Sequence, residues 1–392
     1  FMNAKSKSPV LFPLSLILLV GFTALEINLA YATPIVRLKP TVVQINSFSN
    51  FKRIDIPGAT GGFEVAQIND SGQVAGKYND ANGYHIFLYN TQDETFTTEN
   101  FLADKPSVIA TNDSGQLLGS AYNTLPHIVM PYYFVYSDGT KIDIRGPDDS
   151  TSLLATYAKD INNLGQVAGI YYNGSQNRGY IYDISAAKYT SFDPPSHLAS
   201  PERQLILSGV TGINDGGQVI GTLKSASDQF SGFIYNNGVF DVFKVNNQPT
   251  FPTSINNNGR VAGVYGRFVR DGLSASGLFV YEGDTLTVIK PRVKLAGRIN
   301  STEHRINDNG QMIGHTSHPS TGALQSYLYS NGIFAILSIP DATSTDVTDI
   351  NNRGEVAGTY TDASGVHGFI ATPIIATPVS GNLGGTQSPL NR

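Results

Sequence analysis

Ile68-Asn69-Asp70-Ser71-Gly72-Gln73-Val74-Ala75-Gly76 is the stretch that decides the fold, because this phrase recurs along the chain. Six further copies follow it at intervals of 42 to 52 residues, beginning at Thr111, Ile161, Ile213, Ile255, Ile306 and Ile350. Self-similarity at a period of roughly 20 to 50 residues is the signature of a repeat architecture. A length of 392 residues alone would suggest about two or three domains. The seven copies instead predict one closed repeat fold.

A second signature lies about 20 residues after the start of each phrase: an aromatic residue, an aliphatic residue and tyrosine. These triplets begin at Phe87, Phe134, Tyr180, Phe233, Phe279, Tyr327 and Phe369, and only the last lacks its tyrosine. Short aromatic and β-branched runs bounded by Gly, Asn and Pro are typical of strands. Residues 51–373 show no sustained helical periodicity. We therefore predict an all-β protein.

Each repeat divides into four strands, which in the first copy are expected at Phe63–Asn69, Gly72–Asp80, His85–Asn90 and Phe96–Phe101. The Asn-Asp-Ser-Gly between the first two predicts a hairpin turn with its glycine at positive φ. Gly76, inside the second strand, predicts a bulge or a close backbone approach. Seven such units predict a seven-bladed β-propeller of four-stranded antiparallel blades. A β-solenoid is the alternative.

The two ends of the repeat region predict how the ring closes. A strand at Phe51–Pro57 precedes the first repeat, and the last repeat supplies only three strands, ending with His367–Pro373. We expect the N-terminal strand to complete the C-terminal blade as its outermost strand. Closure of this kind removes the open edges that a linear array of sheets would leave.

The first 32 residues have the pattern of a secretory signal peptide. Lys5 and Lys7 precede an apolar run from Leu11 to Leu25, and Ala30-Tyr31-Ala32 has the form of a cleavage site. A membrane anchor is the alternative, but the apolar run is short for a span of about 20 residues. We predict a secreted protein, extracellular or periplasmic. Residues 33–50 are expected to be a linker, and 374–392 a disordered tail.

Composition excludes several classes of function. The chain has no Cys, so it has no disulfide, thiol nucleophile or thiolate metal site. Its net charge of −5 offers no basic footprint for nucleic acid. We expect a monomer with no cofactor, no nucleic-acid partner and no membrane span in the mature chain.

Two groups of residues suggest metal binding. Calcium needs about six to eight oxygen ligands, usually with several carboxylates. The turns supply at most one carboxylate each, at Asp70, Asp113, Asp215 and Asp308. Three histidines within one repeat, His304, His315 and His318, would suit a transition metal if they came together. We interpret them as exposed loop residues without an acidic partner, and predict no metal site.

These repeats resemble the HAF repeat proteins of bacteria, predicted extracellular proteins named for a His-Ala-Phe tripeptide. The resemblance covers about residues 51–373 and rests on the recurring phrase, on Ile56-Pro57-Gly58-Ala59 and on the stretch 360–369. The tripeptide appears loosely as His85-Ile86-Phe87 and His367-Gly368-Phe369. Only these two of seven copies keep the histidine, so we assign it no chemistry. The resemblance implies export and a repeat fold, but no established activity.

Loop lengths give the only hint of a binding surface. Connections between the second and third strands and between blades vary in length, and they share one face of the predicted ring. Variable loops on a rigid scaffold often carry binding, although drift in unconstrained loops gives the same pattern. Candidate residues on this face are Asp148, Asp149, Glu202, Arg203, Arg267, Arg270 and Asp271.

From that face we predict a secreted binding or surface-interaction module for an extracellular glycan or protein. The alternative is a polysaccharide-active hydrolase or lyase that uses loop carboxylates such as Asp148, Asp149 and Glu202. An enzyme of that kind would hold two carboxyl groups about 5–10 Å apart in a pocket.

Overall fold

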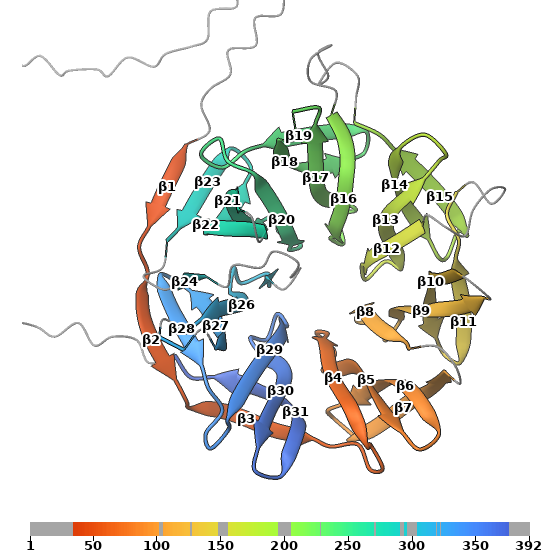
Figure 1. Ribbon diagram of the computed structural model, residues 1–392, viewed down its shortest axis with the longest axis vertical. Helices are drawn as coiled ribbons and strands as arrows, with labels where there is room; N and C mark the ends of the chain where they lie inside the picture. The colour runs from red at the N-terminus through yellow and green to blue at the C-terminus, as the bar shows by residue number, and fades with distance from the viewer. Residues whose placement is uncertain are drawn as a thin grey trace, which may run out of the picture. The chain divides into compact units, whose positions relative to one another are not determined.

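The computed structural model describes residues 34–101, 105–125, 128–147, 156–194, 205–227, 229–269, 272–290, 294–295, 304–318, 320–321 and 323–375. Every regular element in these residues is a strand, and the strands form seven sheets around a central axis (Figure 1). The predicted seven-bladed β-propeller is confirmed. Across the same residues, no helix is long and apolar enough to cross a membrane. The predicted signal peptide lies outside the described residues, as does the predicted tail beyond residue 375.

Each blade is built on antiparallel strands, and in blades 1 to 6 these run in chain order from the axis outward, whereas the outermost strand of blade 7 comes from the start of the chain. Blade 1 holds β4 (Gly61–Ile68), β5 (Gln73–Asp80), β6 (Gly83–Asn90) and β7 (Thr95–Phe101), and blade 2 holds β8 (Ser107–Thr111), β9 (Leu117–Leu125), β10 (Ile128–Ser137) and β11 (Thr140–Ile144). Blade 3 holds β12 (Thr156–Ile161), β13 (Gln166–Tyr172), β14 (Asn177–Asp183) and β15 (Lys188–Phe192), and blade 4 holds β16 (Leu205–Ile213), β17 (Val219–Ser225), β18 (Phe230–Asn236) and β19 (Val239–Phe243).

The remaining blades follow the same plan with small changes. Blade 5 holds β20 (Thr250–Ile255), β21 (Val261–Val269), β22 (Gly272–Glu282) and β23 (Thr285–Ile289). In blade 6 two short pieces, β24 (Lys294–Leu295) and β25 (Arg305–Ile306), both pair with β26 (Met312–Ser317), which is followed by β27 (Leu324–Ser330) and β28 (Ile333–Leu337). Blade 7 holds β29 (Ser344–Ile350), β30 (Val356–Asp362), β31 (Gly365–Pro373) and β3 (Phe48–Ile54).

The repeated phrase forms the turn between the first and second strands of each blade, beside the axis. Its seven glycines all have φ between 71° and 79°, as predicted. Only glycine adopts this backbone conformation without strain, which accounts for its presence in every copy. We call the face that carries these turns the turn face. The opposite face, with the longer connections, is the loop face.

The strand glycine of each phrase makes room for the aromatic core. A Cβ atom on Gly76 would lie 2.1 Å from the Glu64 carbonyl oxygen and 2.6 Å from the Phe87 ring. The β4–β5 register also shifts between Val65 and Gln67, so the predicted close approach and bulge are both present. The first aromatic residue of every triplet is at most 1% exposed. These rings form the centre of each blade's core.

The predicted closure of the ring is confirmed. β3 pairs antiparallel with β31, with Arg53 opposite Phe369, and is the outermost strand of blade 7. The strand begins at Phe48 and ends at Ile54, slightly earlier than the sequence suggests. One blade is therefore built from both ends of the repeat region.

The prediction of a linker at residues 33–50 is wrong. β1 (Ile35–Leu38) pairs parallel with β23, and β2 (Thr41–Ile45) pairs parallel with β28, so blades 5 and 6 each gain a fifth strand. We call β1 and β2 together the strap, which follows the outer edge of the ring in Figure 1. The physical reason is that this segment is rich in β-branched residues and meets apolar sheet edges. Ile45, only 5% exposed, joins the core of blades 6 and 7.

Candidate functional site

The first asparagine of each turn holds the neighbouring blade. Its Nδ2 donates a hydrogen bond to the backbone oxygen of the equivalent asparagine in the next blade, at 2.7–3.2 Å in all seven cases. The last bond, from Asn351 to Asn69, closes the circle. The residues of this asparagine ring are only 3–5% exposed: Asn69, Asn112, Asn162, Asn214, Asn256, Asn307 and Asn351.

Each ring asparagine also stabilises its own turn. The Oδ1 atom of Asn69 accepts a hydrogen bond from the Gln73 N–H, and its Nδ2 donates to the Gln73 side chain, both at 2.8 Å. Sequence reasoning assigned these residues to hairpin turns and missed the contacts between blades. The available signal was that this asparagine is identical in every copy while the residue after it changes.

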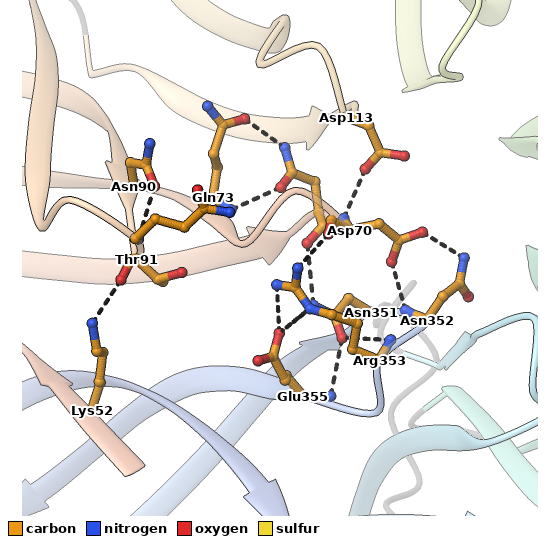
Figure 2. Close-up of polar contacts among 12 residues, drawn as sticks. Lys52, Asp70, Gln73, Asn90, Thr91, Asp113, Asn351, Asn352, Arg353 and Glu355 are labelled. Carbon is orange, nitrogen blue, oxygen red and sulfur yellow. Dashed lines mark hydrogen bonds and ion pairs between the residues drawn. The ribbon is translucent and has the colours of Figure 1, made fainter. Parts of the chain in front are cut away.

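The next residue of each turn forms a second closed circle, which we call the rim. Its Oδ1 accepts a hydrogen bond from the backbone N–H of the equivalent residue in the preceding blade, at 2.6–2.9 Å. Aspartate and asparagine both possess this oxygen, so either residue fits. In Figure 2, Asp70 lies between Asp113 and Asn352 at the junction of blades 7 and 1. The rim is Asp70, Asp113, Asn163, Asp215, Asn257, Asp308 and Asn352.

The three rim asparagines separate most of the rim carboxylates. Asn163 Nδ2 donates to the Oδ2 atoms of Asp113 at 2.7 Å and Asp215 at 3.0 Å. Seven positions cannot alternate strictly around a circle, so one pair of like residues must be adjacent. That pair is Asp70 and Asp113. Burial raises the pKa of Asp70, and the nearby Asp113 carboxylate adds to the shift.

Below the rim, three charged side chains line the channel. Asp160 and Asp349 each follow a register shift in the innermost strand, and a bulge of this kind re-aims a side chain. Asp349 Oδ2 accepts the Ile68 N–H at 3.0 Å, and Asp160 Oδ2 accepts the Ile213 N–H at the same distance. Arg305 Nε lies 4.0 Å from Asp349 Oδ1. Burial raises the pKa of Asp349 to about 6 and also raises that of Asp160, whereas the Arg305 charge opposes both shifts.

These residues surround a cavity of about 170 Å³ at the channel mouth, lined by side chains from all seven blades. The rim offers mainly oxygen acceptors, because the Nδ2 groups of its asparagines already donate to neighbouring carboxylates. Such a mouth is complementary to a ligand that donates hydrogen bonds. Among the residues with described positions, no group of three or more His, Asp or Glu side chains could hold a metal ion.

Of the seven binding residues predicted from the sequence, the structure places only Arg267. This residue is exposed in β21, opposite Ser274 of β22, toward the loop face. Six of the predicted residues lie outside the described residues: Asp148, Asp149, Glu202, Arg203, Arg270 and Asp271. Their grouping stays a prediction, as does the hydrolase or lyase that would use their carboxylates.

The interpretation of His315 as an exposed loop residue is wrong. It lies in β26, is only 4% exposed, and places Nε2 2.6 Å from Asp346 Oδ1 in blade 7. The sequence did not show this acidic partner because Asp346 belongs to the next repeat. His304 is also buried, and His318 Nδ1 accepts the Thr321 N–H at 3.3 Å within a turn.

The two histidines of the loose tripeptide each contact an aspartate on the loop face. His85 Nε2 lies 2.7 Å from Asp80 Oδ1, and His367 Nδ1 lies 2.7 Å from Asp55 Oδ1. Asp362 bonds to Ser364 and to His367, and these bonds lower its pKa to about 2. Each histidine is thus part of a local structural network.

Comparisons with known proteins give a fold and no family. No family model matches the chain, and no curated protein matches it. Two structures of an acylaminoacyl peptidase from Pyrococcus horikoshii are similar, with TM-scores of 0.51 and 0.50 and 9% identity, covering 81% and 84% of this chain and 53% and 52% of that one. TolB from Acinetobacter baumannii has a TM-score of 0.42 and 12% identity, covering 81% of this chain and 67% of that one. The likeness shows the propeller fold alone. The chain spans about half the length of the peptidase.

Proposed function

We propose that this protein is an exported binding module that holds an extracellular glycan or protein at the channel mouth on its turn face. The observation that carries this proposal is the pair of closed hydrogen-bonded circles around the mouth. Each circle ties all seven blades together, so the binding surface exists before a ligand arrives. A preformed surface lowers the conformational entropy that binding would otherwise cost.

The chemistry of the rim supports a ligand rich in hydrogen-bond donors. A carboxylate has about four lone-pair sites. Among the residues that the structure describes, Asp215 accepts two hydrogen bonds, both from Asn163, which leaves acceptor capacity on its carboxylate. Sugar hydroxyls or backbone and side-chain N–H groups of a protein would supply the donors.

Export rests on the pattern of residues 1–32, and the position of the strap is consistent with it. The first described strand begins at Ile35, three residues after the predicted cleavage site, so the mature chain would begin with the strap. N-terminal sequencing of protein secreted by a bacterial host tests this part. A mature terminus at Thr33 supports export, whereas retention of the apolar segment in a membrane fraction contradicts it.

A labelled chain of residues 33–392 on a glycan array, with a parallel pull-down from extracellular extracts, tests binding. Asp308→Asn removes one rim carboxylate and keeps the Oδ1 acceptor of the Asn257 N–H, but it loses the Oδ2 acceptor of the Asn257 and Asn352 amides. Thermal melting of this variant shows whether the rim survives the change. Arg267→Ala is the control on the loop face. We expect binding to weaken with Asp308→Asn and to persist with Arg267→Ala. The reverse pattern would assign binding to the loop face, and the absence of any retained ligand would contradict a binding module.

A further inference from the structure

A groove separates blades 3 and 4 on the turn face, outside the channel mouth. Its cavity measures about 300 Å³ and is lined by Gln166, Ile181 and Lys188 of blade 3 and by Tyr235 of blade 4, among others. A smaller cavity of about 200 Å³ lies at the equivalent place between blades 1 and 2. The grooves are therefore a feature of the repeat.

At two other junctions a carboxylate of the preceding blade accepts a hydrogen bond from the tyrosine that is equivalent to Tyr235. Tyr281 donates a hydrogen bond to Asp241 at 2.8 Å, between blades 4 and 5, and Tyr136 donates one to Glu99, between blades 1 and 2. Strand register places Thr190 of blade 3 where blade 4 has Asp241. A threonine side chain is too short and lacks the charge to replace the carboxylate. Tyr235 is only 7% exposed and its ring stacks on Phe192 of blade 3 at 4.2 Å between centroids, so it forms one wall of the groove.

The junction between blades 2 and 3 is closed in a different way. Ile184 packs there against the hydrophobic core of blades 2 and 3, close to the turn glycine Gly165. The equivalent position between blades 3 and 4 is Asn237, a polar residue in the turn that follows β18. The larger volume of the groove between blades 3 and 4 thus accompanies two local replacements in the repeat.

An exposed apolar residue stands at the entrance of this groove. Leu164 is 62% exposed and occupies the turn position that is polar or glycine in every other copy. Together with Ile181 it gives the groove an apolar side. Single exposed apolar residues are common on protein surfaces, so Leu164 is significant because of its position, where it lines the same cavity as Ile181.

We propose that the groove between blades 3 and 4 binds a saccharide residue. Sugar hydroxyls both donate and accept hydrogen bonds, and the groove offers the donor-only Lys188, the acceptor-only Asp183 and the dual-purpose Gln166. Leu164 and Ile181 would cover the C–H face of the ring. The volume lies at the lower end of small-molecule pockets, roughly 300 to 1,000 Å³. This inference rests on the proposed binding function but assigns it a second site.

Saturation-transfer NMR tests the groove, with residues 33–392 and a panel of methyl glycosides of hexoses, deoxyhexoses and hexuronic acids. Thr190→Asp rebuilds the carboxylate found at blade 4, and Leu164→Ser installs the residue found in the first two turns. We expect each change to lower the affinity for the best-binding glycoside about tenfold, as the loss of about one hydrogen bond or apolar contact would do. Leu324→Ser, the same replacement at another exposed leucine, should leave binding unchanged.

Two results would overturn the groove as a saccharide site. One is that no methyl glycoside shows saturation transfer. The other is glycoside binding that survives Thr190→Asp and Leu164→Ser but is lost with Asp308→Asn, which would place the sugar at the channel mouth and leave the proposed function standing. If the pull-down retains a protein ligand and no glycoside binds, the saccharide site in the groove is contradicted while the proposed binding function stands. Thermal melting of each variant shows whether the fold is intact.

Discussion

At the first position of the aromatic triplet, five blades carry phenylalanine and two carry tyrosine, Tyr180 and Tyr327. Both tyrosines are fully buried, and neither hydroxyl has a hydrogen-bond partner among the residues that the structure describes. Burial raises the pKa of both hydroxyls well above the ordinary value. An unpaired buried hydroxyl is a cost that the phenylalanine copies avoid.

Tyr180→Phe is therefore expected to stabilise the protein, by about 1 kcal/mol. Urea unfolding followed by circular dichroism measures the change. The reciprocal replacement Phe87→Tyr, at the same position of blade 1, should lower stability. A destabilised Tyr180→Phe would show that the hydroxyl has a favourable contact in solution.

The asparagine ring and the rim should respond differently to the exchange of an amide and a carboxylate. Asn214→Asp replaces an Nδ2 donor by an oxygen that faces the Asn256 carbonyl oxygen, so it should destabilise by about 2–3 kcal/mol. Asp215→Asn keeps the Oδ1 acceptor for the Asn163 N–H but loses the Oδ2 acceptor of the Asn163 amide. Because this part of the rim is exposed, water can satisfy the displaced amide, and the cost should be about 1 kcal/mol or less. Free energies of unfolding for the two variants provide the comparison. Equal losses would contradict the separate roles.

The raised pKa of Asp349 predicts that the stability of the protein depends on pH. Its folded pKa of about 6 lies above the ordinary value of 3.8, so the folded state binds the proton more tightly than the unfolded chain. Stability contributed by this group is complete below about pH 3.8 and is lost as the pH rises through 6, by on the order of 3 kcal/mol. Asp349→Asn should flatten this part of the curve, measured by urea unfolding from pH 4 to pH 7. An unchanged slope would contradict the assignment.

Among the outer strands, charge distinguishes the edges that the strap covers from those left open. β23 and β28, which pair with the strap, contain no charged residue. Each of the five uncovered outer strands carries at least one charged residue. These are Lys52 and Arg53 in β3, Glu99 in β7, Lys141 and Asp143 in β11, Lys188 in β15, and Asp241 in β19. Charges on an edge strand discourage pairing with another chain. The strap therefore covers the two edges that lack this protection.

Deletion of residues 33–46 should expose these two uncharged edges and cause self-association. Light scattering with size-exclusion chromatography measures this, and deletion of residues 376–392 is the control. We expect a monomer for the control and larger species for the strap deletion. A strap-deleted chain that remains monomeric would show that the strap does not protect the edges.

Local patterns in the sequence were enough to predict the blades and their turns. Gly72 and its equivalents occupy the positive-φ position of a four-residue turn, which the turn sequence alone indicates. The last repeat lacks a fourth strand, and this gap implied that β3 completes its blade. The strap was missed because residues 35–45 do not resemble the repeat, and parallel pairing with a distant outer edge leaves no local signature. The asparagine ring was missed for a similar reason, since each bond reaches a residue 42 to 52 positions away, or 282 at the closing junction.

At the scale of the whole molecule, closure joins the two ends of the chain's repeat region. β3 and β31 share one sheet, and the Asn351–Asn69 and Asn352–Asp70 bonds complete the two circles at the same junction. The channel mouth is complete only when this junction is closed. The proposed binding function therefore depends on the pairing of β3 with β31.

A single engineered disulfide tests this closure most directly, because the natural chain has no Cys to compete with it. Ser49 and Thr372 lie opposite each other in β3 and β31, a distance that a disulfide can span. In the Ser49→Cys, Thr372→Cys double variant we predict nearly complete cross-linking of the native protein, seen as a faster band on a non-reducing gel, and a higher melting temperature. A control pair, Ser49→Cys with Asn177→Cys in blade 3, should not cross-link within one chain. A double variant that keeps both thiols free under oxidising conditions, while folded, would contradict the closed seven-bladed ring.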